Sequence, residues 1–433
     1  MRISTSQIYS SGALGIQRNQ SELVKLQNQL SSGRRIVSPE DDPVAAAQAL
    51  VVTQSKEVNA QYLENQGSAS AQLGFLDNQL TALTGLLHNV RERVVQAGNT
   101  TLNNSDRQSI ATELQSRLEE MMGLANSQNG AGEYLFSGYQ GGVRPFALNA
   151  AGVVAYSGDD GARLLQVSQS RQMQISVDGN DLFMNAKGGN GSFVASAGGN
   201  VGGGVNLGSA VVDAGSVLDP QKWVSGLNGY PWSSPTSPAL QIRFAVVGPV
   251  RTYQLYDVSV PGTPVALTAA APYTPGQAIP ITTTTLPATD FGSQVVVSGL
   301  PADGDTIAIT PSAHQSLFKT MQSVLTTLGS STAGGSYTTT QYTNEIAAQL
   351  TNLDQALDNV SRVQSTIGAQ MRELDSLGST ASAADLQFRE SLSDLQDLDY
   401  AKAISDFTRQ QVNLEAAQKS FVQISQLSLF NYL

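Results

Sequence analysis

The chain has 433 residues, no cysteine, two histidines and a formal net charge of −11, from 24 basic and 35 acidic residues. The lack of cysteine excludes disulfides and thiolate sites. The two histidines, His88 and His314, lie far apart in sequence, which argues against a metal centre or a histidine-based enzyme. The acidic balance argues against tracking of nucleic-acid phosphates, and no apolar run approaches the roughly 20 residues of a membrane span. We expect no enzyme activity, cofactor or metal site, and no nucleic-acid or membrane partner.

The composition separates helical ends from a β-rich middle. No glutamate lies between Glu133 and Glu345, and 14 of the 16 prolines fall between Pro145 and Pro311. Glutamate favours helices, whereas proline is excluded from helix interiors and central strands. We therefore predict a mainly α protein with a β-rich insertion. Both chain ends would form a long coiled-coil-like bundle, and residues 147–311 would form an outer antiparallel β domain.

The first predicted helix spans residues 5–32. Its apolar residues recur at seven-residue intervals, with Ala13 and Leu26 on interleaved positions. Gly33 fits a left-handed helix end, and Asp42 and Pro43 fit the N-cap and first turn of a second helix.

The second predicted helix, residues 43–97, carries the longest apolar seam. Between residues 69 and 97, apolar residues alternate steps of four and three without a break, a period typical of a coiled coil or a long helical hairpin. We expect the part from 73 to 94 to be core within one chain. A third helix follows, with Ser105 and Gln108 as its expected capping box.

The middle of the chain predicts antiparallel strands, with turns at 178–179 and 303–304. The alternating segments are residues 164–179, 241–247, 251–260 and 293–310. The acidic turns at 157–160 and 178–181 lack the ligand spacing and closing glutamate of an EF-hand loop. We interpret them as hairpin turns rather than Ca²⁺ sites.

Helices resume after the insertion. A short helix is expected at 313–328, and a seam at 346–374 is expected to be core within one chain. The segment GSTASAAD, residues 378–385, is interpreted as a break or hinge before a last helix at 386–427.

The outermost helices are expected to depend on neighbouring chains. One narrow apolar stripe on each helix does not offset the entropy lost when about 30 residues are ordered. We therefore expect mobile ends in the monomer, at 1–35 and 395–433, that become ordered on assembly. The residues expected to pack subunits together are Tyr9, Ile16, Leu23, Leu26, Leu30, Ile404, Phe407, Leu414, Phe421 and Ile424.

These patterns predict three domains. Residues 1–35 and 395–433 form the axial core of an assembly, 36–146 and 312–394 form a helical bundle, and 147–311 form the outer domain.

The loop at 34–43 mixes charges of both signs. Lateral salt bridges between subunits are one interpretation, and a solvated turn between two helices is the other. The residues concerned are Arg34, Arg35, Glu40, Asp41 and Asp42.

Three segments resemble a known family. LSSGRRIVSPEDDP, residues 30–43, resembles the N-terminal segment of the bacterial flagellin superfamily. ANSQNGAGEYLFSGYQ, residues 125–140, and the C-terminal residues 401–433 resemble its hook-filament junction branch. The resemblance covers about 1–146 and 340–433 and is looser in the middle. Filament flagellins usually carry an NSAKDDAAG-like segment where this chain has VSPEDDP.

The resemblance implies a structural subunit that joins hook to filament and templates flagellin polymerisation, outside the cell at the hook-filament junction. It implies export by the flagellar type III system without a cleaved signal. Implied partners are the first hook-filament junction protein, flagellin, the filament cap, sister copies in a ring, and an export chaperone that binds the C-terminal helix within 401–433.

Two alternatives stay open. One is a filament flagellin subunit. The other is an enzyme or binding module in the insertion, with a small-molecule or glycan site within 186–310. Such a site needs a concave pocket with convergent polar groups.

Overall fold

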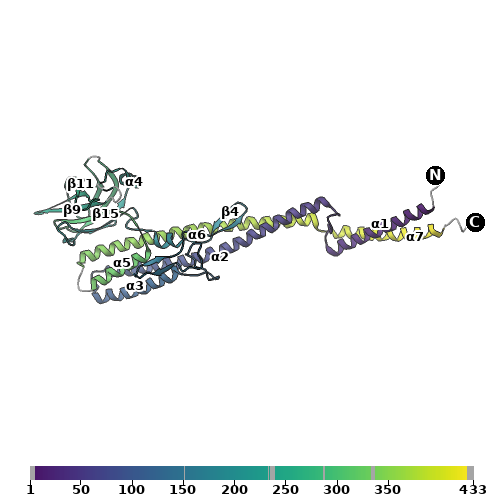
Figure 1. Ribbon diagram of the computed structural model, residues 1–433, viewed down its shortest axis with the longest axis horizontal. Coiled ribbons are helices and arrows are strands. Elements are labelled where there is room, and N and C mark those ends of the chain that lie inside the picture. The colour runs from purple at the N-terminus through teal and green to yellow at the C-terminus, as the bar shows by residue number, and fades with distance from the viewer. Residues whose placement is uncertain are drawn as a thin grey trace, which may run out of the picture. The chain divides into compact units, whose positions relative to one another are not determined.

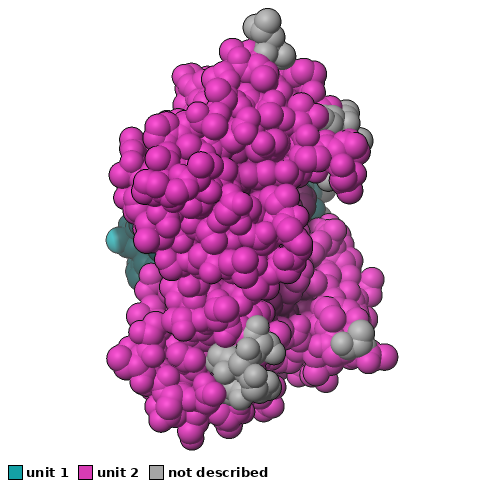
Figure 2. All heavy atoms as spheres, turned by 90° about the vertical axis from the view of Figure 1, so that its left-hand side faces the viewer, with its two compact units in different colours: residues 1–68, 166–171, 374–433 teal, residues 69–165, 172–373 magenta. Residues whose placement is uncertain are grey.

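The computed structural model describes residues 5–150, 152–232, 234, 239–285, 288–332 and 337–426. The chain divides into two compact units, which Figure 2 colours separately. Unit 1 comprises residues 1–68, 166–171 and 374–433, and unit 2 comprises 69–165 and 172–373. Among the described residues, no helix combines the length and the hydrophobicity of a membrane span.

Unit 1 is built from helices of both chain ends. Helix α1 (Thr5–Ser32) lies along α7 (Tyr400–Gln426), as Figure 1 shows. The unit also contains the first part of α2 (Pro43–Ala97) and the last part of α6 (Thr339–Gln396). The bounds of α1 and α2 confirm the prediction, because the proline, glycine and cap signals that set them are local.

The helices of unit 2 enclose a continuous apolar core. They are the remainder of α2, α3 (Asn104–Ala125), α5 (Leu317–Thr332) and the remainder of α6. On α2, the predicted seam is at most 1% exposed at Leu73, Leu76, Leu80, Leu83, Leu87, Val90 and Val94. On α6, Ile346, Leu353, Val360 and Ile367 are at most 4% exposed. Both seams are therefore core within one chain, as predicted.

The β domain within unit 2 contains two main antiparallel sheets. The first has the order β11-β10-β9-β15-β6, with β12 beside β10, and the second has the order β13-β14-β7, with β8 beside β14. The strands of the first sheet are β6 (Phe193–Asn200), β9 (Leu240–Val247), β10 (Val250–Asp257), β11 (Val265–Ala266), β12 (Ala271–Pro272) and β15 (Asp305–Pro311). Those of the second are β7 (Val211–Val212), β8 (Ser216–Val217), β13 (Ala278–Thr282) and β14 (Asp290–Ser298).

The β domain has its own apolar core, which includes both tryptophans. Phe291 packs against Trp223 and Trp232, with ring centroids 6.2 and 5.6 Å away. Trp223 belongs to α4 (Pro220–Gly229), a helix that the sequence analysis did not predict, although Asp219 accepts amide hydrogen bonds at its N-terminus and Pro220 opens its first turn.

Short elements lie outside the two main sheets. They are β1 (Phe146–Leu148), β2 (Val154–Tyr156), β3 (Leu164–Ser168), β4 (Arg171–Gln174), the π-helix η1 (Asn180–Met184), β5 (Ala186–Lys187) and β16 (His314–Gln315). The hairpin β3–β4 contains residues of both units. The chain enters the β domain after β5 and leaves it before β16, and these two strands pair antiparallel. Next to that pair, the Gly188 amide donates to the Ala313 carbonyl at 3.1 Å.

Several local predictions were wrong. Helix α6 continues through residues 378–385 to Gln396, and the last helix begins at Tyr400 rather than 386. The small residues of this segment suit a helix that packs closely, since Ala381 is 8% exposed and its carbonyl accepts a hydrogen bond from Asn59.

The other errors concern caps and turns. Residues 157–160 do not form a hairpin turn, because β2 before them pairs with β1 and β3 after them pairs with β4. The capping box of α3 is formed by Asn103 and Asp106, because the helix begins before Ser105. Residues 178–179 lead into η1 rather than a hairpin, and the Asp178 carboxylate accepts the amides of Asn180 and Asp181.

Candidate assembly surface

The pair α1–α7 leaves several of its apolar side chains exposed. None of the α1 side chains that the structure describes is buried, and Ala403 is the one buried side chain described in α7. Two helices can cover only one face of each other, so the remaining faces stay in contact with solvent. Unit 1 therefore lacks the third layer that gives the helices of unit 2 a core.

The predicted packing residues mostly form the seam between α1 and α7. Half-buried are Tyr9, Ile16, Leu23, Leu26 and Leu30 on α1 with Phe407, Leu414 and Phe421 on α7. The Tyr9 and Phe421 rings meet edge to face, with centroids 5.8 Å apart. Ile404 is 54% exposed, and the side chain of Ile424 lies outside the described residues, as do residues 427–433.

Polar groups set the register of this pair. The Gln410 side-chain amide donates to Asn19 Oδ1 on α1 at 3.2 Å. A cross-helix polar contact of this kind favours one alignment of two helices over its neighbours.

A second apolar stripe on each helix was missed by the sequence analysis. Leu14 and Val24 on α1 are 55% and 50% exposed, and Val412 and Val422 on α7 are 59% and 51% exposed. Leu14 and Val24 lie about 80° apart around α1, on one side of the helix. These residues do not repeat at seven-residue intervals, so only the exposed fraction of each side chain reveals the stripe.

The part of α2 in unit 1 adds further exposed apolar side chains. Val44, Leu50 and Val51 are 68%, 71% and 63% exposed. Large apolar side chains that gather on the exposed surface of a helix are typical of a protein interface. A groove of about 500 Å³ in the same unit is lined by side chains that include Val58, Tyr62, Leu377, Ala381 and Phe388.

The charged loop at 34–43 is engaged within its own chain. Asp41 pairs with Lys25 at 3.0 Å, and Arg35 lies 3.7 Å from Asp42. The Asp42 carboxylate also accepts the Ala45 amide and so caps α2. Arg35 donates to the carbonyl of Leu395 at 2.8 Å.

Hydrogen bonds from the loop backbone hold Asp41 in its ionised form. The Ser38 and Val37 amides each donate to Asp41 Oδ2 at 3.0 Å. The Ser38 amide, with the Lys25 ammonium, lowers the pKa of the Asp41 carboxyl below its ordinary value. Of the five charged residues expected at lateral contacts, Arg34 and Glu40 are exposed and have no salt bridge within the described part of the chain.

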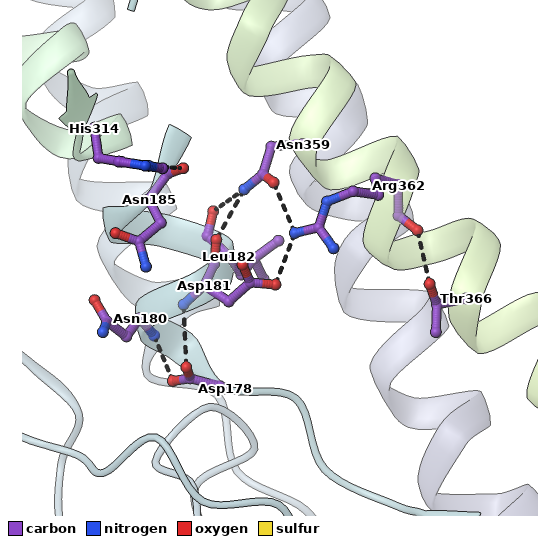
Figure 3. A network of polar contacts seen from close by, with 9 residues as sticks. All are labelled: Asp178, Asn180, Asp181, Leu182, Asn185, His314, Asn359, Arg362 and Thr366. Carbon is purple, nitrogen blue, oxygen red and sulfur yellow. Dashed lines mark hydrogen bonds and ion pairs between the residues drawn. The ribbon is translucent and has the colours of Figure 1, made fainter. Parts of the chain in front are cut away.

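In unit 2, a polar network attaches η1 to α6 (Figure 3). The Asn359 amide donates to the carbonyls of Asp181 and Leu182 at 2.9 and 3.0 Å, and Arg362 pairs with Asp181 at 2.7 Å. His314 Nδ1 lies 3.0 Å from the Asn185 carbonyl oxygen. In the described ranges, no three metal-ligating side chains come together. The contacts of Asn359 and Arg362 join η1 to α6.

Comparisons with known proteins agree with this architecture. Residues 3–141 match the family described as bacterial flagellin N-terminal helical region, and residues 350–433 match bacterial flagellin C-terminal helical region. The chain is 26% identical over 430 residues to flagellar hook-associated protein 3 of Escherichia coli, covering 99% of each chain. It is 38% identical over 183 residues to flagellar hook-associated protein 3 of Salmonella typhimurium, an alignment that covers 42% of this chain and 57% of that protein.

A solved structure supports the same assignment. The flagellar junction protein FlgL from Legionella pneumophila matches 82% of this chain and 100% of its own length, with a TM-score of 0.65 at 26% identity. The two matched helical regions make up more than half of the chain and include α1, α2, α3, α7 and most of α6. The chain therefore belongs to the bacterial flagellin family.

Proposed function

We propose that this chain is the structural subunit that joins the flagellar hook to the filament and templates flagellin polymerisation. The observation that carries the proposal is the uncovered apolar surface of unit 1, in a chain that aligns along 99% of its length with a hook-associated protein. A monomer gains nothing from exposing Leu14, Leu50 and Val412, whereas neighbouring copies in a tube bury them.

The proposed mechanism is coupled ordering and assembly. In one chain, α1 and α7 bury only the seam between them, which stabilises such a pair weakly. Neighbouring subunits would cover the second stripe, so that each added subunit orders the ends of the one before it. The exposed Ile404 and the uncovered halves of the seam residues, such as Tyr9 and Phe421, would take part in the same contacts.

Several partners follow from this role. The first hook-filament junction protein would lie below the ring of sister copies, flagellin above it, and the filament cap at its distal end. The subunit would leave the cell through the flagellar type III system. An export chaperone would bind within residues 401–433, because α7 carries exposed apolar side chains that no neighbouring subunit covers before assembly.

The charged loop has a smaller part in this proposal. Because Arg35, Asp41 and Asp42 have partners within the chain, lateral contacts are proposed for Arg34 and Glu40. Charge reversal of Asp41 would break the hydrogen bonds and the ion pair that this residue makes within its own chain, so it would not test a subunit contact alone.

A filament subunit is the alternative structural role. Complementation separates the two roles: this chain should restore filaments to a strain that lacks its own junction protein, and should not restore them to a strain that lacks flagellin. Rescue of the flagellin-deficient strain alone would contradict the proposal.

Substitution of the second stripe tests the contact surface itself. Leu14→Gln with Val412→Gln should abolish junction assembly while the monomer keeps its helix content, because both side chains are exposed before assembly. The control, Leu80→Gln, should instead unfold unit 2, since that side chain is fully buried. Normal assembly of the double variant would show that the stripe does not bind neighbouring subunits.

A further inference from the structure

The sheet of the β domain has a polar face opposite its core. Leu240, Ile242 and Phe244 of β9 point into the core, so the alternating Gln241 and Arg243 lie on the other face. On that face, Gln241 donates to the Thr306 hydroxyl at 3.0 Å, and its side-chain oxygen accepts Arg243 Nε at 2.7 Å.

The guanidinium of Arg243 is held in place from a second side. It lies 4.5 Å from the centroid of the Tyr256 ring, a cation–π contact, and the Tyr256 hydroxyl donates to Gln254 at 2.8 Å. Gln254 in turn donates to the Thr268 carbonyl at 2.7 Å. A cationic group fixed in this way is preorganised, since binding a ligand would cost it little further entropy.

A hollow of about 440 Å³ lies over this face. Its lining includes Asn200, Arg243, Thr252, Tyr256, Asp303 and Gly304. The volume lies within the range of small-molecule sites, about 300–1,000 Å³. The concave shape and the polar lining are the two properties that a ligand site in the insertion requires.

The hollow contains both donors and acceptors without protein partners. Within the described residues, no acceptor takes the terminal nitrogens of Arg243, and the Thr252 hydroxyl has no hydrogen bond. Asp303 accepts the Val246 amide at 2.9 Å through Oδ1, which leaves Oδ2 as an acceptor. A positive and a negative group therefore line the same hollow.

We propose that this hollow binds a neutral carbohydrate. Neighbouring sugar hydroxyls both donate and accept, so one sugar can satisfy Arg243 and Asp303 together. An anion would pair with Arg243 but be repelled by Asp303, and an apolar ligand would leave both groups unpaired. This site is independent of the assembly surface, because it lies in the β domain and uses no residue of unit 1.

A glycan array with neutral and acidic oligosaccharides tests the proposal on the labelled full-length chain. The strongest neutral oligosaccharide is then titrated by calorimetry. We expect Arg243→Met to weaken its binding about tenfold or more, since it removes hydrogen bonds from a charged donor. Asp303→Asn should also weaken it, because the amide can keep the Val246 contact only by presenting a donor in place of Oδ2. Arg117→Met, at a half-buried arginine of α3 outside the β domain, is the matched control and should leave binding unchanged.

Three results would overturn the proposal: no neutral oligosaccharide bound by the unmodified chain, affinity unchanged in Asp303→Asn, or binding of acidic glycans that strengthens in that variant. Thermal unfolding of each variant shows whether the β domain remains folded. Should Arg243→Met unfold it, Asp303→Asn decides, because it alters a turn rather than a central strand.

Discussion

The side-chain amide of Asn359 connects the π-helix η1 to α6. It satisfies two backbone carbonyls, Asp181 and Leu182, whereas the neighbouring Arg362 forms an ion pair that is about half exposed on both sides. Half-buried carbonyls without donors are costly, and exposed ion pairs contribute little.

We therefore expect Asn359→Ala to lower the free energy of unfolding of unit 2 by about 1–3 kcal/mol. The control, Arg362→Met, should lower it by less than about 1 kcal/mol. Urea denaturation followed by circular dichroism measures both. A larger loss for Arg362→Met than for Asn359→Ala would show that the ion pair, and not the amide, holds η1.

The Asp41 carboxylate makes the loop at 34–43 sensitive to acid. Its pKa is lowered in the folded chain, so its contribution is complete above the unfolded pKa and is lost as pH falls through the folded pKa. We expect the amide resonances of Val37 and Ser38 to shift on acidification with a midpoint below the ordinary value of 3.8. The shift should be absent in Asp41→Asn. A midpoint at or above that value would contradict the assigned hydrogen bonds.

At the scale of elements, helix limits and seams could be predicted because their signals are local or periodic. Pro43 fits the first turn of α2, Gly33 has a φ of 69° directly after α1, and the seam of α2 needs only its 3.5-residue repeat. The segment at 378–385 was misread because its composition suggests a break, whereas the contact from Asn59 to the Ala381 carbonyl holds it in helix. Tertiary contacts of this kind leave no trace in local sequence.

The continuity of α6 makes a direct prediction for Gly378. A Cβ at this position would meet Gln66 Oε1 at 3.6 Å, an ordinary contact, so alanine fits. Gly378→Ala should stabilise unit 1 by about 0.5–1 kcal/mol in thermal unfolding, since alanine has the higher helix propensity. The matched control is Gly368→Ala in the same helix, where a Cβ would meet nothing within 4 Å. Destabilisation by Gly378→Ala alone would indicate a hinge at 378–385.

The candidate assembly surface could be predicted only in part. The repeat identified Tyr9, Ile16 and Phe421 as apolar contacts, and the structure shows that these side chains first serve the pair within one chain. Periodicity reveals that a face is covered but not whether the same chain covers it. The second stripe, which includes Leu14 and Val412, has no repeat and required the exposed fractions.

At the scale of the whole molecule, the β domain is an insertion with adjacent ends. Gly188 and Ala313 are hydrogen-bonded beside the pair β5–β16, so a two-residue turn can replace the residues between them. We expect a variant with Asn-Gly in place of residues 189–312 to keep its helix content, to stay within about 2 kcal/mol of the parent in the stability of its helical core, and to restore filaments in the complementation assay.

The same deletion separates the roles of the two parts of the chain. Carbohydrate binding should be lost with the β domain, while filament growth should continue. Loss of filament growth in a variant that is folded and exported would show that the β domain is needed at the junction.

Hydrogen exchange on the dilute monomer tests the central claim most directly. That claim is that contacts with neighbouring subunits order the terminal helices α1 and α7. The account predicts that amides of α1 and α7 exchange about 100-fold or more faster than those of residues 73–94, and that this difference disappears in the assembled junction. Equal protection of all three segments in the dilute monomer would contradict it.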